Sequence, residues 1–242
     1  MAKIFITGSS DGLGLFTAQK LVESGHEVVL HAKNDKRAEQ TAAKFQKKMK
    51  ILTADLSDLE EVKHLAKKVN SLGNFDVIIH NAGVYNESKE KIFKINNLAV
   101  YILTALINKP KRLIYIGSNM HPQGDTNIEK LSLEKGVDYS TSKLQILMLS
   151  LALARLCPEI YTNTVDPGWV KTKMANYNAP DSLEDGSQTQ IWLASDDTLT
   201  FNGKYFYHLK ESDYSSKAED IEMQNKLLKI YEKITGIPLP KE

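Results

Sequence analysis

The chain has 242 residues and an almost balanced charge, with 31 lysines and arginines against 30 aspartates and glutamates. The resulting net charge of +1 at pH 7 argues against a general nucleic-acid binder, because affinity for a phosphate backbone needs a cationic surface. The longest apolar run, residues 144–156, is interrupted by polar side chains and is too short to span a membrane. The single cysteine, Cys157, excludes an intrachain disulfide, and we expect it to be buried and inert. These features favour a cytoplasmic protein.

Short β-branched runs alternate along the whole chain with segments whose apolar residues recur at helical spacing. We expect seven strands, at Lys3–Thr7, Glu27–Ala32, Lys50–Ala54, Asp76–His80, Arg112–Gly117, Tyr161–Val165 and Lys204–His208. The helical segments include one that Ser57 and Glu60 would begin as a capping box and a C-terminal one over about 217–234. This alternation is typical of a doubly wound parallel sheet covered by helices on both faces. We therefore predict one Rossmann-like α/β domain over residues 1–242, with its chemistry at the carboxyl ends of the strands.

A glycine-rich turn follows the first predicted strand and leads directly into a helix. Glycines permit a tight turn and a close approach of the backbone to a phosphate, and a helix N-terminus offers free N–H groups. The spacing differs from the general G-x-G-x-x-G pattern, but the strand–turn–helix context favours a nucleotide site. The residues of this predicted site are Gly8, Ser9, Ser10, Asp11, Gly12, Leu13 and Gly14.

The ends of the next three strands would complete a dinucleotide site. The second strand ends in Lys33 and Asn34 with no acid before Asp35, whereas a site for NAD commonly has an acid there. Lys33 is able to pair with a 2′-phosphate, so we predict NADP(H) over NAD(H), against the alternative of an ordinary surface lysine. After the third strand, Asp55 and Leu56 would either contact adenine or simply begin a helix. After the fourth, the small residues Asn81, Ala82 and Gly83 would let the backbone pass close to the cofactor, or form a simple turn.

Tyr139 and Lys143 are four residues apart on a predicted helix, which places both side chains on one face. A nearby ammonium favours the phenolate and would lower the tyrosine pKa, which suits proton transfer to or from a carbonyl or hydroxyl oxygen. The same spacing recurs at Tyr85 and Lys89, and in a lysine-rich chain we interpret that second pair as a coincidence. Tyr139 is favoured because it begins a long apolar helix between two strand ends.

Taken in order, these motifs resemble the classical short-chain dehydrogenase/reductase family over nearly the whole chain. The resemblance rests on the glycine turn, Asp55-Leu56, Asn81-Ala82-Gly83, Asn96, Ser118, Tyr139 with Lys143, and residues 167–172. Within the family, Ser142-Lys143-Leu144, Gly203-Lys204-Tyr205-Phe206 and the segment 188–194 resemble the retinol-dehydrogenase-like and WW-domain oxidoreductase-like branch.

The resemblance implies a role for each matching residue. Tyr139 would be the general acid/base, Lys143 would lower its pKa and bind the nicotinamide ribose, and Ser118 would orient the substrate oxygen. Asn96 would help to hold a proton-relay water. Pro167, Gly168, Val170 and Thr172 would border the nicotinamide. The resemblance also implies a homodimer or homotetramer and no metal ion.

The segments beside the substrate are less informative. Asp11 departs from the basic residue that NADP-preferring relatives often have before the second glycine. The loop between Ser118 and Tyr139 is long, and we expect its His121 to face solvent. A substrate lid is expected at about residues 174–187, and Trp169 and Trp192 are interpreted as packing residues.

The leading hypothesis is an NADP(H)-dependent oxidoreductase acting on a carbonyl/alcohol pair of small molecules, with hydride transfer by the cofactor. One alternative is a non-enzymatic NADP(H)-binding sensor or interaction module on the same fold. Another is a different Rossmann-like enzyme, such as a methyltransferase or an epimerase.

Overall fold

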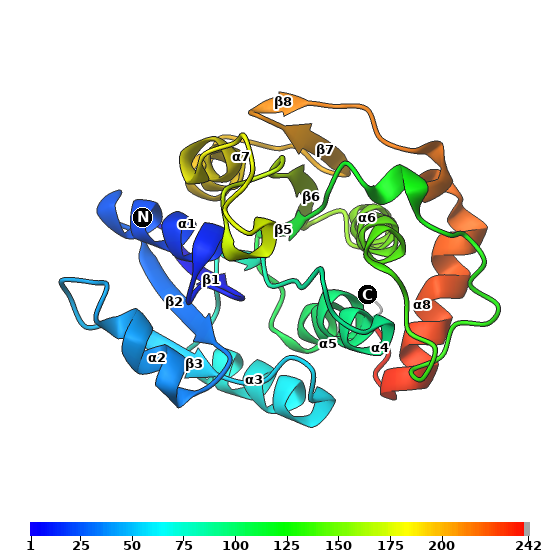
Figure 1. Ribbon diagram of the computed structural model, residues 1–242, viewed down its shortest axis with the longest axis horizontal. Helices are drawn as coiled ribbons and strands as arrows, with labels where there is room; N and C mark the ends of the chain where they lie inside the picture. Colours follow the sequence, from blue (N-terminus) through cyan, green and yellow to red (C-terminus); the bar gives the residue numbers. More distant parts are fainter. Residues whose placement is uncertain (240–242) are drawn as a thin grey trace.

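The sheet of the protein has eight strands in the order β3-β2-β1-β4-β5-β6-β7-β8 (Figure 1). We describe residues 1–239 of a computed structural model, so residues 240–242 of the predicted domain lie outside the described part. The strands are β1 (Lys3–Ile6), β2 (Glu27–Ala32), β3 (Lys50–Thr53), β4 (Val77–His80), β5 (Arg112–Ile116), β6 (Tyr161–Asp166), β7 (Lys204–Tyr207) and β8 (Lys210–Glu211).

The first seven strands pair in parallel, and β8 pairs antiparallel with β7 at the sheet edge. All seven predicted strands are present, with bounds within one residue of the prediction. The doubly wound α/β fold is thus confirmed. The prediction missed β8, because a two-residue strand carries no periodic pattern.

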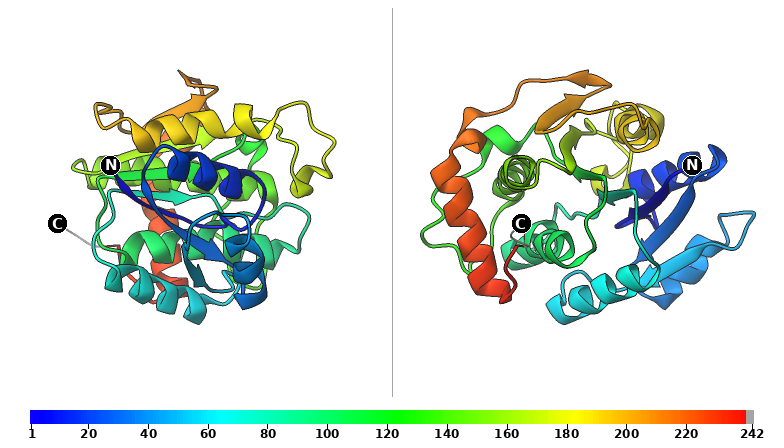
Figure 2. Two further views of the ribbon diagram at one scale, coloured as in Figure 1. Left: turned by 90° about the vertical axis from the view of Figure 1, so that its left-hand side faces the viewer. Right: turned by 180° about the vertical axis from the view of Figure 1, so that it is seen from behind.

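Helices cover both faces of the sheet (Figure 2). One face is covered by α1 (Gly12–Glu23) and α7 (Leu183–Ser195), the other by α3 (Leu59–Ser71), α5 (Ala99–Leu106) and α6 (Tyr139–Leu156). The alternation along β1 shows the two layers, because Ile4 and Ile6 pack in the α1/α7 core and Phe5 in the opposite core. Most strands buried on both faces are apolar and read as hydrophobic runs, whereas β6 buries the polar Thr162, Asn163 and Thr164.

The longest helix, α6, is buried almost all round, because the sheet lies on one side and α8 (Ile221–Thr235) on the other. Tyr231 of α8 is fully buried, packs its ring 5.3 Å from that of Tyr101 on α5, and donates a hydrogen bond of 2.9 Å to Gln145 on α6. Cys157, at the end of α6, is buried as predicted. Within residues 1–239, no helix combines the length and the apolar character needed to cross a membrane.

Two of the predicted helix beginnings were wrong. Ser57 does not cap α3. The carboxylate of Asp58 does so instead, accepting from the peptide N–H groups of Glu60 and Glu61. The C-terminal helix begins after Asp220, since residues 216–219 form a separate 3-10 turn. The remaining two short helices are α2 (Asp35–Ala42) and α4 (Lys89–Ile92), and a π-helical segment over Phe93–Leu98 joins α4 to α5.

Candidate active site

The carboxyl ends of the parallel strands open into one cleft of about 900 Å³. Most of the residues predicted as a site line it, from every strand end considered: Gly8, Ser10, Asp11, Gly12, Leu13, Gly14, Lys33, Asp55, Leu56, Asn81, Ala82, Gly83, Ser118, Tyr139, Lys143, Pro167, Gly168, Val170 and Thr172. Ser9, Asn34 and Asn96 are not among its lining residues. The strand ends therefore bring the glycine turn and the Tyr139/Lys143 pair into a single cavity, although the two lie far apart in sequence.

The glycine turn packs against the small residues that follow β4. Gly8 has a φ of 63°, and a Cβ on it would lie 2.8 Å from the Cα of Ala82. A Cβ on Gly14 would collide with the side chain of Asn81 and lie 2.5 Å from the carbonyl oxygen of Gly8. The Asn81 amide donates to the carbonyl oxygens of Thr7 and Gly8, at 3.0 and 3.1 Å. The two turns are thus one packed unit that leaves the N-terminus of α1 open to a phosphate.

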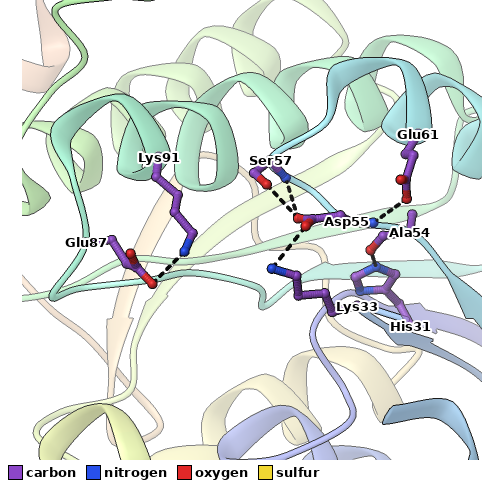
Figure 3. Close-up of polar contacts among 8 residues, drawn as sticks. All are labelled: His31, Lys33, Ala54, Asp55, Ser57, Glu61, Glu87 and Lys91. Carbon is purple, nitrogen blue, oxygen red and sulfur yellow. Dashed lines mark hydrogen bonds and ion pairs between the residues drawn. The ribbon is translucent and has the colours of Figure 1, made fainter. Parts of the chain in front are cut away.

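His31, at the end of β2, is a residue of this region that the sequence analysis missed (Figure 3). Its Nδ1 accepts from the peptide N–H of Gly8 at 3.0 Å, so its Nε2 carries the proton and donates to the Ala54 carbonyl at 3.0 Å. Burial lowers the pKa of His31 to about 4, which keeps the ring neutral. Ser9 turns inward to the same cluster, donating to Ile6 and accepting from the peptide N–H of His31. Ser9 therefore holds the turn from behind.

Two cations near the end of β2, Lys33 and Arg37, are each paired with a carboxylate. The Lys33 ammonium lies 3.0 Å from Asp55, which also accepts from the backbone and hydroxyl of Ser57 (Figure 3). Burial alone would raise the pKa of Asp55, but the hydrogen bonds from Ser57 and Lys33 hold it below its usual value. Arg37 lies 3.6 Å from Asp11, and its peptide N–H is capped by Asn34. The sequence analysis missed Arg37, although its place in the first turn after β2 could have indicated it.

Tyr139, Lys143 and Ser118 come together at the other end of the cleft. The Lys143 ammonium donates to the carbonyl oxygen of Ile116 at 2.7 Å and lies 5.4 Å from the centre of the Tyr139 ring. Burial raises the pKa of Tyr139 to about 12, against a hydrogen bond with Ser118 that lowers it. Burial also lowers the pKa of Lys143 to about 8. Removal from water therefore dominates the pKa of Tyr139 in this state, and the lowering expected from Lys143 stays a prediction.

Asn96 lies in the π-helical segment over Phe93–Leu98 and is buried. Its side-chain oxygen accepts from the peptide N–H of Val84 at 2.9 Å, and its amide donates to the Val84 carbonyl and the Ser142 hydroxyl, each at 3.0 Å. Asn96 thus joins the segment after β4 to the first turn of α6, between Tyr139 and Lys143. Its role in holding a water stays a prediction.

Two interpretations of the sequence need correction, on His121 and Trp169. His121 does not face solvent, because it is 3% exposed and bonded on both ring nitrogens. Tyr85 lies in the cleft with its ring edge-on to that of Tyr139 at 4.8 Å, whereas Lys89 is not among the lining residues, so the Tyr85/Lys89 pair stays a predicted coincidence. Trp169 is 59% exposed and lines the cleft, whereas Trp192 packs on Phe206 as expected.

Only the first part of the expected lid borders the cleft, through Met174, Ala175 and Asn176. Residues 183–187 belong instead to α7, which Ser182 and Asp185 begin with a capping box. The predicted lid therefore ends near residue 182.

Asp166 is a third missed residue, after His31 and Arg37, and lies at the end of β6 directly before Pro167. It is 4% exposed and accepts from the peptide N–H of Gly168 at 3.0 Å. Burial raises the pKa of Asp166, while Gly168, Tyr205, His121 and Lys143 oppose that rise. Asp166 therefore places a buried carboxyl group where it interacts electrostatically with the buried Lys143 ammonium.

Comparison with known proteins gives this geometry a context. The model of the short chain dehydrogenase family matches residues 2–182. "Short-chain dehydrogenase chry4" of Gibberella zeae is 37% identical, with 99% of each chain covered. Retinol dehydrogenase 14 of Mus musculus is 27% identical, covering 97% of this chain and 86% of that one. A crystal structure of a short chain dehydrogenase from Burkholderia cenocepacia in complex with NADP superposes with a TM-score of 0.69 at 20% identity, over 85% and 95% of the two chains.

Proposed function

The chain belongs to the short chain dehydrogenase family, in its retinol-dehydrogenase-like branch, and from this we propose that it is an NADP(H)-dependent oxidoreductase for a carbonyl/alcohol pair. Family membership makes it a hydride-transfer oxidoreductase acting on CH–OH and C=O groups. The cofactor preference and the residue roles are our proposal.

The observation that carries the proposal is the shared cleft, with the glycine turn at one end and Tyr139, Lys143 and Ser118 at the other. The turn suits a pyrophosphate, because Gly8 and Gly14 admit no Cβ and the first residues of α1 line the cleft behind the N-cap Asp11. A nicotinamide cofactor, when bound, supplies the hydride.

The protein's own residues then supply the proton and its placement. Tyr139 is protonated well above neutral pH, so its phenol donates a proton to the carbonyl oxygen during reduction. The Ser118 hydroxyl orients that oxygen and stabilises the charge that develops on it. The Lys143 ammonium, held by the Ile116 carbonyl, stabilises the phenolate that remains.

The preference for NADP(H) is supported by Lys33, which lines the cleft at the end of β2, and by Arg37, which lies 3.6 Å from the cleft residue Asp11. Lys33 and Arg37 would each exchange a carboxylate for a 2′-phosphate, which prefers such charged donors. The bound NADP of the Burkholderia cenocepacia relative supports the same choice. A cytoplasmic location and assembly into a homodimer or homotetramer stay predictions.

The test replaces Tyr139 by Phe and measures NADPH oxidation with a panel of aldehydes and ketones. Loss of the proton donor should lower kcat by roughly 100- to 10,000-fold, with NADPH affinity unchanged. Tyr85→Phe is the matched control, because it removes a hydroxyl from the same cleft but keeps the ring contact. Turnover by Tyr139→Phe at the parent rate would refute the mechanism. NADPH binding by the parent without turnover of any carbonyl would favour the non-enzymatic binding module.

A further inference from the structure

His121 is buried beside the catalytic serine in a 3-10 turn over His121–Gln123, and the mechanism above does not use it. Its Nδ1 lies 2.8 Å from the carbonyl oxygen of Ser118, and its backbone N–H donates to the same oxygen at 3.1 Å. Its Nε2 accepts from the peptide N–H of Ser215 at 3.0 Å. A carbonyl only accepts and a peptide N–H only donates, so these partners select one neutral tautomer with the proton on Nδ1.

The C-terminal segment holds this turn at a second point. Lys217 donates to the carbonyl oxygens of Pro122 and Gly124, at 3.0 and 3.4 Å. The ring of Tyr205, on β7, lies 5.1 Å from the His121 ring and supports it from the sheet side. In Figure 1 this turn, in green, lies beside the orange segment that leads to α8. A segment some 90 residues later in the chain thus fixes the turn that carries the active-site serine.

The position of Ser118 matters because its hydroxyl is hydrogen-bonded to Tyr139, and that bond opposes the effect of burial on the Tyr139 pKa. The neighbouring Met120 lines the cleft and donates its peptide N–H to the Ser118 hydroxyl at 3.2 Å. A shift of about 1 Å in such a group costs up to roughly 100-fold in rate. A phenyl ring in place of the imidazole would fill the space but could not hold the Ser118 carbonyl.

We propose that His121 is a positioning residue for catalysis, which links Ser118 to the C-terminal segment at Ser215 and so sets where the Ser118 hydroxyl meets Tyr139. The proposal rests on the proposed function, since it concerns the same reaction. His121 donates no proton to substrate, because both of its ring nitrogens are engaged by backbone groups.

The first pair of variants separates space-filling from hydrogen bonding. His121→Phe should lower kcat roughly 10- to 100-fold while the dissociation constant for NADPH stays within twofold. His121→Asn keeps an N–H near the Nδ1 position and should recover at least a third of the loss on a logarithmic scale. A kcat of His121→Phe within twofold of the parent, or an equal fall in NADPH affinity, would overturn the proposal.

The second pair tests the link to the C-terminal segment. Ser215 has a φ of −65°, which lies in the range of proline, so Ser215→Pro removes the N–H that donates to His121 and puts the ring Cδ in its place. The hydroxyl is lost in both Ser215→Pro and Ser215→Ala, so it does not distinguish them. Ser215→Pro should lower kcat with little change in NADPH affinity, whereas Ser215→Ala keeps the N–H and should match the parent. Equal kcat values for the two variants would contradict the link.

A measurement without substrate distinguishes failure of this inference from failure of the proposed function. Nitrogen-15 NMR of labelled histidines should show His121 as a single neutral Nδ1–H tautomer that persists as the pH falls through the ordinary histidine range. If the parent turns over no carbonyl, the proposed function fails and the catalytic role of His121 fails with it, whereas the spectrum still tests whether His121 links Ser118 to Ser215. An Nε2–H tautomer, or an ordinary titration, would overturn it.

Discussion

Replacing Lys33 by Met tests the proposed preference for NADP(H) over NAD(H). The ammonium of Lys33 lies 3.0 Å from Asp55, and 56% of the side chain is exposed to solvent. The substitution keeps the length of the side chain and removes its charge, so it deletes one donor to a 2′-phosphate and leaves the glycine turn unchanged.

The size of the effect follows from the exposure. A hydrogen bond to a charged group contributes roughly 1.5–3 kcal/mol when it is shielded from water. Lys33 is more than half exposed and must leave Asp55, so we discount this to about 1–1.4 kcal/mol. That corresponds to a loss of roughly five- to tenfold in NADPH affinity. The affinity for NADH, which lacks the phosphate, should stay within twofold.

The assay is a fluorescence titration with energy transfer to the nicotinamide from Trp169, which lines the cleft. Adding salt should shrink the difference between the parent and Lys33→Met, since exposed charges are screened. Lys47→Met makes the same change in net charge at an exposed lysine outside the cleft lining and serves as the control. An equal loss of NADPH and NADH affinity, or none for either, would refute the reasoning.

Three further predictions concern pH, the glycine turn and stability. Because the pKa of Tyr139 is raised to about 12, the phenol stays protonated at neutral pH. The rate of carbonyl reduction should therefore not change with pH near neutrality. The rate of alcohol oxidation needs the phenolate and should rise roughly tenfold per pH unit. A flat oxidation profile would contradict this assignment. Gly14→Ala should weaken NADPH binding at least about tenfold in a titration, since its Cβ would collide with Asn81. Unchanged binding would show that the turn can move to accommodate a Cβ, which would contradict the prediction. Tyr231→Phe leaves the buried oxygen of Gln145 unpaired and should cost about 1–2 kcal/mol, lowering Tm by roughly 2–8 °C in thermal unfolding; an unchanged Tm would contradict the value given to that bond.

The sequence alone determined the sheet and the position of the site along it. Most of the parallel strands were visible as apolar runs, whereas β6 was recognised through its β-branched residues although it buries Thr162, Asn163 and Thr164. The glycine turn was predicted from its place between the first strand and a helix, and the structure shows Gly8 and Gly14 packed against Ala82 and Asn81. Tyr139 and Lys143 were predicted from their spacing on one helix face and from the apolar helix that Tyr139 begins between two strand ends.

The sequence did not determine which polar side chains are buried behind the cleft. From the sequence, His121 is a loop residue, but in the structure the peptide N–H of Ser215, 94 positions later, donates to its ring. His31 holds the glycine turn only because Ala54, across the sheet, accepts from its ring. Tyr85 was dismissed because its spacing to Lys89 is common, yet the turn after β4 brings its ring onto Tyr139.

The difference has one physical cause. The periodicity of helices and strands arises from neighbours within a few residues, so it is visible in short stretches of sequence. The charge state and orientation of a buried polar group depend instead on desolvation and on partners that only the packed chain supplies. The sequence therefore located Tyr139, whereas only the tertiary structure decided that burial raises its pKa and that His121 holds Ser118 beside it.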